Sequence, residues 1–328
     1  LTAVLSCAPL FAGGCSVMAG RGADAQAAAI VSASDATAVE YLAAREIRRY
    51  VYLRTGTLLP VVRSDSKLPG AKALIVVGQK DRPAVAALIA KDPKLASSVD
   101  SLKAQQYLLR TTNLANRRVV LITGGDAVGT LYAAYRFAEH LGVRFCLHGD
   151  TIPDERIALA MPDLDERGEP LFDVRGIQPF HDFPEGPDWW NSDDYKAIIA
   201  QLPKLRMNFF GLHTYPQGGV GPEPTVWIGT PADYNEDGTV KFSYPSRHFT
   251  TANVTGAWGY QPAKTGDYSF GAAEFFERDD YGPDYMLGMN PWTQLPPEKA
   301  NELFNRMGRT LSDAFEYAHA LGVKTCIG

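Results

Sequence analysis

Apolar residues recur at intervals of three and four along two segments in the first half of the chain, as they do on one face of a helix. One segment starts after Asp35, the predicted helix cap, and stops at Gly56, and the other runs over residues 126–140 and stops at Gly142. Apolar runs without this spacing predict strands at residues 29–31, 59–62, 73–77, 106–110, 119–122 and 143–147. The pattern predicts a small α/β sandwich domain over residues 27–162, with helices packed against a sheet.

The second half has a different order of elements. Residues 163–170 belong to a stretch rich in Asp, Glu and Pro and are predicted to be a linker. Continuous apolar runs, typical of parallel strands buried on both faces, then alternate with helical segments. The three runs are residues 172–180, 208–213 and 323–327. The predicted fold class is therefore α/β, with the sandwich domain followed over residues 171–328 by a truncated TIM-type (β/α)8 barrel, of which only the first three strands are present.

A long insertion separates the second and third predicted strands. Residues 214–296 far exceed an ordinary βα loop, and such insertions are usually functional or separately folded. The segment is rich in aromatic residues interleaved with Asp, Asn and Arg. Sugar rings pack their C–H faces on aromatic rings, so this composition suits a carbohydrate cleft. The alternative is that most of these aromatics form a small core of the loop itself.

The amino-terminal segment indicates export. Residues 1–26 are small and apolar with a small-x-small site at Ala23-Asp24-Ala25, and we interpret them as an incomplete secretory signal peptide. Ala12-Gly13-Gly14-Cys15 loosely resembles a lipoprotein signal, so simple export is predicted, with a lipid anchor at Cys15 as the alternative. No transmembrane helix is expected, because glycines interrupt a stretch that is already too short. The expected location is periplasmic, secreted or on the outer surface as a lipoprotein.

Composition and charge narrow the partners. The chain has 328 residues, 45% of them hydrophobic, and a formal net charge of -5 with both signs scattered along it. Nothing in this balance suggests nucleic acid or an anionic membrane surface as a partner. Outside the signal segment only Cys146 and Cys326 are present, both in apolar runs, and we expect buried free thiols.

A glycine-rich stretch over residues 124–129 lies between a predicted strand and helix. It lacks the Gly-Lys-Ser/Thr ending of a phosphate loop and the glycine spacing of a dinucleotide site. A tight turn in which Asp126 caps the helix accounts for the same residues. We therefore expect a supporting role for this domain rather than a catalytic one.

Two short motifs carry a family resemblance. An exported α/β domain followed by a barrel whose first strand contains Arg175-Gly176 resembles the α-glucuronidases and the β-hexosaminidase group of glycoside hydrolases. Residues 206–213, Arg-Met-Asn followed by a strand ending in His213, resemble the hexosaminidase pattern Lys-Met-Asn and a strand that ends in His. The resemblance implies that Arg175 contacts sugar hydroxyls and that His213 lies beside the bound sugar.

The chain departs from the hexosaminidase pattern directly after this histidine. Thr214-Tyr215-Pro216 stand where those enzymes have an acidic pair, so specificity for N-acetylhexosamine is not implied. The catalytic carboxylates of that group follow the fourth strand. The catalytic residues are therefore unknown and expected beyond Gly328.

The barrel rule adds further candidates. Active sites of such barrels lie at the carboxyl ends of the strands, which places the residues after each predicted strand on one rim. The predicted substrate-binding residues are Arg175, His181, Asp182, Trp190, His213, Tyr215, Trp227 and Trp292. The alternative for each histidine is a structural side chain at the start of a loop. Neither a metal nor a cofactor is predicted, because His181, Asp182, His213 and Glu223 lack close ligand spacing.

These inferences predict an exported, α-glucuronidase-like glycoside hydrolase. Its partner would be a complex or uronic-acid-containing oligo- or polysaccharide, and the present chain would be an inactive fragment that lacks the later strands. The alternative is a non-catalytic carbohydrate-binding surface protein that uses the same aromatic residues. A metal-dependent lyase or oxidase ranks third.

Overall fold

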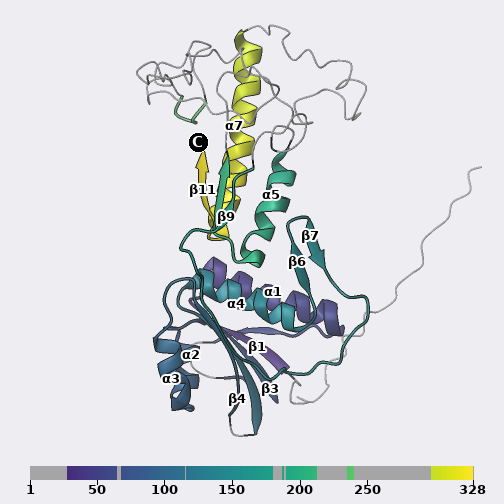
Figure 1. Ribbon diagram of the computed structural model, residues 1–328, viewed down its shortest axis with the longest axis vertical. Coiled ribbons are helices and arrows are strands. Elements are labelled where there is room, and N and C mark those ends of the chain that lie inside the picture. Colours follow the sequence, from purple (N-terminus) through teal and green to yellow (C-terminus); the bar gives the residue numbers. More distant parts are fainter. Residues whose placement is uncertain are drawn as a thin grey trace, which may run out of the picture.

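The structure is a computed structural model, and it describes residues 28–64, 68–114, 116–179, 187, 190–212, 235–239 and 297–327. The described residues form a first part, residues 28–168, built on a six-stranded sheet, and a second part, residues 171–327, built on a three-stranded sheet. Figure 1 shows the three-stranded sheet standing on the helical layer of the first part.

The sheet of the first part is mixed. Its strands, in spatial order, are β2 (Val61–Arg63), β1 (Ala28–Ser32), β3 (Ala73–Gln79), β5 (Arg117–Gly124), β4 (Tyr107–Leu114) and β8 (Asp165–Gly168). The first four run parallel, and β4 is antiparallel to both of its neighbours. The predicted linker therefore contains an edge strand, β8. Edge strands often carry charges that discourage pairing with a further strand, and the sequence of β8, Asp-Glu-Arg-Gly, is of this kind. Such a charged sequence cannot be told from a linker by composition.

Helices cover both faces of this sheet. The long helices α1 (Ala38–Thr55) and α4 (Ala127–His140) pack on one face, and α2 (Pro83–Ile89), η1 (Pro93–Leu95) and α3 (Ala96–Asp100) pack on the other. Alternate residues of β3 divide between the two cores: Ile75 and Val77 face α1 and α4, whereas Leu74 and Val76 face α2 and α3. The predicted α/β class is confirmed. The short helices over residues 83–100 were not predicted, because so few turns leave no clear periodicity.

Local signals explain where the two long helices begin and end. Thr37, rather than the predicted Asp35, caps α1: its hydroxyl accepts from the Glu40 amide, and the Glu40 carboxylate accepts from the Thr37 amide. Gly56 ends α1 in the left-handed conformation, with φ 74°. Asp126 caps α4 as predicted, and Gly142 follows it at φ 93°.

The apolar run at 143–147 forms a strand, but not in the main sheet. Strand β6 (Arg144–Cys146) pairs with β7 (Gly149–Thr151) in a separate antiparallel hairpin. The hairpin contacts the short turn η3 (Pro203–Leu205) of the second part. Phe145 anchors it on the first part by packing edge to face on Tyr50 and Tyr135.

The second part begins with three parallel strands in chain order. Strand β10 (Phe209–Leu212) lies between β9 (Gly176–Ile177) and β11 (Lys324–Ile327), and α5 (Ser192–Gln201) and α7 (Pro297–Ala320) pack on one face. The core between them contains Tyr195, Ile199, Phe210, Leu212, Leu311, Ala314 and Ala318. The three predicted β/α elements are confirmed. In the residues that the structure describes they form an open sheet and not a closed barrel.

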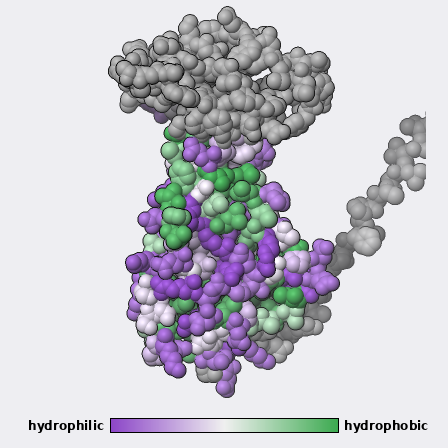
Figure 2. All heavy atoms as spheres, in the orientation of Figure 1, coloured by the Kyte–Doolittle hydropathy of each residue, from purple (hydrophilic) through white to green (hydrophobic). Residues whose placement is uncertain are grey.

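On the other face of this sheet Phe209 is half-buried and Cys326 exposed, whereas Gly211 is buried. Figure 2 shows hydrophobic residues gathered over the second part above a largely polar first part. Cys326 of β11 is exposed and Cys146 of β6 is half-buried. Both thiols are free, but the expectation that they are buried is wrong. Cys326 alternates with Ile327, which packs on the helices, so its side chain points to the face opposite the helices.

Candidate functional site

The candidate site is the edge at which the three parallel strands of the second part end. Phe210 of β10 lies opposite Ile177 of β9, and Leu212 lies opposite Ile327 of β11. The carboxyl ends of all three strands therefore meet at one edge, and in Figure 1 their arrowheads point away from the first part. This arrangement confirms that the two strands predicted to carry sugar-binding residues lie side by side and run in the same direction.

Most of the predicted binding residues follow these strand ends but lie outside the described residues. They are His181, Asp182, His213, Tyr215, Trp227 and Trp292. Their roles stay predictions. What the structure supplies is the common edge from which the chain leaves β9 and β10.

Arg175 lies at the opposite end of the sheet, directly before β9. Its Nε donates to the Arg206 carbonyl over 2.8 Å, and its Nη2 donates to Gln105 Oε1 over 2.8 Å. Its Nη1 donates to the Phe172 carbonyl over 2.6 Å, and the guanidinium lies 5.8 Å from the centre of the Tyr132 ring. The structure therefore does not bring Arg175 to the edge where the predicted histidines follow, and the sugar contact implied by the resemblance stays a prediction.

Trp190 belongs to the packing around α5. Its half-buried ring meets the buried Tyr195 ring edge to face, with 5.3 Å between the centroids. Its backbone amide donates to the Pro187 carbonyl over 3.4 Å. These contacts hold the indole beside the helix, and its use as a sugar platform stays a prediction.

A polar junction joins the two parts at the amino ends of β9 and β10. Asn208, which is 3% exposed, accepts from the Arg175 amide through Oδ1 over 2.9 Å. Its Nδ2 donates to Gln105 Oε1 and to the Asp173 carbonyl, each over 2.8 Å. Gln105 comes from the loop before β4 of the first part. The Gln105 side chain of the first part thus contacts the residues that precede two strands of the second part, β9 and β10.

Charges of opposite sign continue this junction along α4. Arg206 donates through both terminal nitrogens to the Glu139 carboxylate, and Arg136 donates to Glu139 over 3.0 Å. Burial acts to raise the pKa of Glu139, but these two arginines outweigh it and hold the pKa below its usual value of 4.5. Burial likewise acts to lower the pKa of Arg206, and Glu139 raises it. Both groups are therefore charged at neutral pH.

A second contact across the junction is a buried ion pair. Lys204 of η3 donates to both carboxylate oxygens of Asp150 in β7, over 2.8 and 3.0 Å, and the two side chains are 7% and 8% exposed. The Tyr50 hydroxyl of α1 donates to the same carboxylate over 2.7 Å. Burial, together with the neighbouring carboxylates, raises the pKa of Tyr50 well above its usual range, so the phenol keeps its proton.

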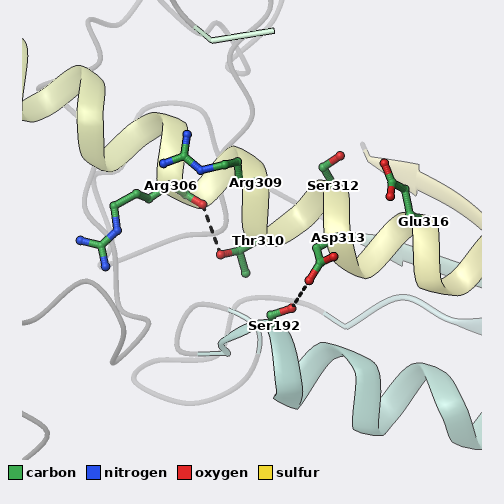
Figure 3. A pocket seen from close by; sticks show the side chains of 7 residues that line it. All are labelled: Ser192, Arg306, Arg309, Thr310, Ser312, Asp313 and Glu316. Carbon is green, nitrogen blue, oxygen red and sulfur yellow. Dashed lines mark hydrogen bonds between the residues drawn. The ribbon is translucent and has the colours of Figure 1, made fainter. Parts of the chain in front are cut away.

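An open hollow of about 580 Å³ lies between the start of α5 and the middle of α7 (Figure 3). Ser192 donates to Asp313 over 2.8 Å at one end of it, and Lys196 pairs with the same carboxylate over 2.5 Å. The two arginines that line the other end, Arg306 and Arg309, point in different directions from α7 (Figure 3). The hollow does not direct its charged groups at one point and is therefore a weaker candidate than the strand edge.

Among the described residues, no group of three or more His, Cys, Asp or Glu side chains is arranged to hold a metal ion. No helix in the part of the chain that the structure describes is long and apolar enough to cross a membrane.

The first part carries the family signal. Residues 18–137 match the glycosyl hydrolase family 67 N-terminus. Within the described residues this match runs from β1 into α4, so it covers most of the six-stranded sheet and of the helical layer on which the second part stands. The match confirms the predicted resemblance to glycoside hydrolases. The second part lies outside it.

Several solved structures are similar in fold over more of the chain. A GH115 4-O-methyl-α-glucuronidase with specificity for decorated arabinogalactans is 17% identical over 57% of this chain and 25% of its own, with a TM-score of 0.42. A GH20 exo-β-N-acetylglucosaminidase from Vibrio harveyi is 11% identical over 93% of this chain and 33% of its own, with a TM-score of 0.39. A GH138 enzyme targeting pectin rhamnogalacturonan II is 12% identical over 92% of this chain and 24% of its own, with a TM-score of 0.41.

The chain thus spans a quarter to a third of the length of these three structures. No curated protein matches it in sequence.

Sequence reasoning missed most of the junction between the first part and the second part. Asn208 stands in the motif that carried the resemblance, but its contacts were not predicted. Gln105, Glu139 and Lys204 gave no signal, because a polar residue in a loop or on a helix surface looks the same whether it faces water or another part of the protein.

Proposed function

We propose that this chain is the amino-terminal part of an exported, α-glucuronidase-like glycoside hydrolase that acts on complex or uronic-acid-containing polysaccharide. The observation that carries the proposal is the match of residues 18–137 to the glycosyl hydrolase family 67 N-terminus. Export rests on the signal-like composition of residues 1–26, with a lipid anchor at Cys15 as one form of it.

The proposal assigns the second part to the start of a β/α barrel. Strands β9, β10 and β11 are parallel, adjacent in chain order and backed by α5 and α7 on one face, as in a unit that closes when further strands are added. Active sites of such barrels lie beyond the carboxyl ends of the strands. Substrate would therefore bind at the strand edge, held by His181 and Asp182 after β9 and by His213 and Tyr215 after β10.

The chemistry requires more than this edge. Glycoside hydrolysis uses two carboxyl groups that flank the scissile bond, about 5–5.5 Å apart for retention and about 6.5–9.5 Å apart for inversion. We assign neither to a residue of this chain and place both on later strands. The histidines of the edge would bind and orient the sugar, and in the protonated form they would attract the carboxylate of a uronic acid through charge-assisted hydrogen bonds.

Activity assays of the intact protein, including any sequence that follows Gly328, test this function. We expect release of the leaving group from an aryl α-glucuronide and of uronic acid from uronic-acid-containing oligosaccharides. His213→Ala should lower kcat/KM about tenfold or more, because a positioned hydrogen bond to substrate is lost. His319→Ala is the matched control, since His319 bonds Thr325 near the opposite end of β11 and should leave the rate unchanged.

Absence of turnover with every glycoside would overturn the proposed reaction. Binding of the oligosaccharides by a protein that never cleaves them would instead support the non-catalytic carbohydrate-binding alternative.

A further inference from the structure

Two residues with unusual backbone conformation, one from each part, lie at the junction and both bond Arg175. Gln105 at φ 64° and Arg206 at φ 59° are the two non-glycine residues with positive φ among those that the structure describes. The left-handed region is unfavourable for both residue types, and such residues persist where the surrounding structure holds them in place. Gln105 belongs to the first part and Arg206 to the second.

The backbone of Gln105 is hydrogen-bonded to the first part, and its side chain is hydrogen-bonded to the second. Its backbone amide donates to Asp126 Oδ1 over 3.0 Å, and the same oxygen caps α4 through the Gly129 amide over 2.7 Å. Its side-chain carbonyl accepts from Arg175 and from Asn208, each over 2.8 Å. A single acceptor fixed to the cap of α4 therefore ties the residue before β9 to the residue before β10.

Arg206 makes the reverse connection. Its guanidinium donates to both oxygens of Glu139 on α4, and its own carbonyl accepts from Arg175 Nε over 2.8 Å. The second part thus reaches back to the same helix that positions Gln105. We call this set of contacts, made by Gln105, Arg206, Arg175, Asn208 and Glu139, the reciprocal clamp.

The reciprocal clamp lies beside β9 and β10, which share few backbone hydrogen bonds with each other. Strands β9 and β10 pair over two residues only, Gly176 with Phe209 and Ile177 with Phe210. Next to that pairing, the Asn208 amide donates to the Arg175 carbonyl over 2.7 Å. Such a short ladder leaves the relative position of the strands weakly determined, so side-chain contacts at their amino ends contribute a large share of the constraint.

We propose that Gln105 and Arg206 are positioning residues, through which the first part fixes β9 and β10 relative to each other and so places the residues that follow their carboxyl ends. The catalytic consequence rests on the proposed function, whereas the structural step does not. Displacement of binding groups by as little as 1 Å can cost about a hundredfold in rate, so a supporting domain that sets strand position also sets activity.

Amide hydrogen exchange of the 328-residue chain tests the structural step without any substrate. In Gln105→Ala we expect two backbone amides to exchange at least about tenfold faster than in the wild type. They are the amide of Asn208 and the amide of Lys324, which donates to the Asn208 carbonyl over 2.8 Å. Amides of β3 should keep their wild-type rates. Arg82→Ala is the control: it breaks an ion pair inside the first part and should speed exchange there without affecting Asn208.

Two further substitutions distinguish the loss of the Gln105 side-chain contacts from the effect of strain in its backbone. Gln105→Gly removes the side chain but suits a positive φ, so it should fold and exchange as fast at Asn208 as the alanine variant. Gln105→Glu loses the Nε2 donor to the Asp173 carbonyl but keeps, at the same reach, a carboxylate oxygen that can accept from Arg175 and Asn208, and it should restore slow exchange. Wild-type exchange at Asn208 in the glycine variant, or uniform acceleration through both parts, would overturn the positioning role.

Kinetics of the intact protein then test the consequence. Gln105→Ala should lower kcat for glycoside cleavage about tenfold or more, with rescue by Gln105→Glu. Faster exchange with unchanged kcat would overturn the catalytic consequence of the clamp. A wild-type protein that cleaves no glycoside would sink the proposed function, and the exchange result would still decide whether the clamp positions the strands.

Discussion

Asp126 shows how much one side chain can do at the residue scale. Its Oδ1 accepts from the Gly129 amide at the start of α4 and from the Gln105 amide in the neighbouring loop. Its backbone carbonyl accepts from the Thr130 hydroxyl over 2.9 Å. Helix capping and the positioning of Gln105 therefore depend on the same carboxylate.

Replacement of Asp126 should lower the free energy of unfolding, because it removes several of these contacts at once. Asp126→Ala removes the cap and the second acceptor, and we expect a loss of about 2 kcal/mol in the free energy of unfolding, measured by urea denaturation. Asp126→Asn retains an acceptor and should lose less than half of that. Equal stability of the two variants would contradict the assigned role of the acceptor.

Glu40 is a buried carboxylate whose charge the fold requires. Its side chain is fully buried, and it accepts from Arg82 Nη2 over 2.6 Å and from the Gln79 amide over 3.0 Å. Burial acts to raise its pKa, but Arg82 and the backbone donors of Gln79 and Thr37 hold the pKa below the usual 4.5. Because the folded-state pKa is the lower one, the stabilisation is complete above about pH 4.5 and is lost as the pH falls through the folded value.

Glu40→Gln should therefore make the free energy of unfolding depend less on pH in the acid range. We expect a loss of about 3 kcal/mol at pH 7, where Arg82 loses its buried partner, and a smaller difference from wild type at pH 3. Urea denaturation at a series of pH values measures both. A constant difference at every pH would contradict the assignment of the acid dependence to Glu40.

At the scale of elements, the connection from β5 to α4 explains the glycine-rich stretch of the sequence. A Cβ atom on Gly125 would lie 1.9 Å from the Lys103 carbonyl oxygen, and one on Gly124 would lie 2.2 Å from the Thr130 amide nitrogen. Backbone atoms of the adjoining elements occupy that space and cannot easily move. The glycines are therefore needed for close packing of strand, helix and loop, and a phosphate ligand is not required to account for them.

Alanine at two glycines gives a matched comparison. Gly125→Ala should cost about 3 kcal/mol or prevent folding, because the added methyl group meets backbone. Gly70→Ala meets no atom within 4 Å and should change the free energy of unfolding by no more than about 0.5 kcal/mol. Thermal unfolding followed by circular dichroism measures both. Similar melting temperatures for the two variants would show that the connection yields to the methyl group.

At the scale of the whole molecule, charged pairs join the two parts beside the apolar contacts of Leu42 and Leu205. The Lys204 and Asp150 side chains form a buried pair, and removal of one member leaves the other charged and desolvated. Arg206 and Glu139 lie on the other side of the same junction. Unfolding of the second part should therefore be coupled to the first part through these pairs.

The distribution of tryptophan makes this coupling measurable. All five tryptophans follow residue 188, so fluorescence reports the second part alone, whereas circular dichroism reports both. The two signals should give one transition in the wild-type chain. Lys204→Ala should move the fluorescence transition to lower urea, which corresponds to a loss of about 3 kcal/mol in the free energy of unfolding of the second part. Lys196→Ala removes an exposed pair with Asp313 and should shift neither by more than about 0.5 kcal/mol. Coincident transitions in Lys204→Ala would show that the coupling of the two parts does not depend on the Lys204–Asp150 pair.

Much of the architecture was predictable where the signal is local. The periodicity of α1, the glycine stop at Gly56, the Asp126 cap and the three apolar runs of the second part each depend on a few neighbouring residues. Charged β8 and the short helices over residues 83–100 were missed, because their sequences resemble loops. Placement of Arg175 at the sugar edge depended on resemblance alone, and the structure puts it at the other end of β9.

The sequence by itself determined the α/β class, the ends of the long helices and the order of the parallel strands, since propensity, capping and apolar spacing act over a turn or a strand. Only the tertiary structure decided which polar side chains meet. Gln105 lies 103 residues before Asn208, and Asp150 lies 54 residues before Lys204. Contacts at such separations depend on how whole elements pack, and no pattern of neighbouring residues encodes them.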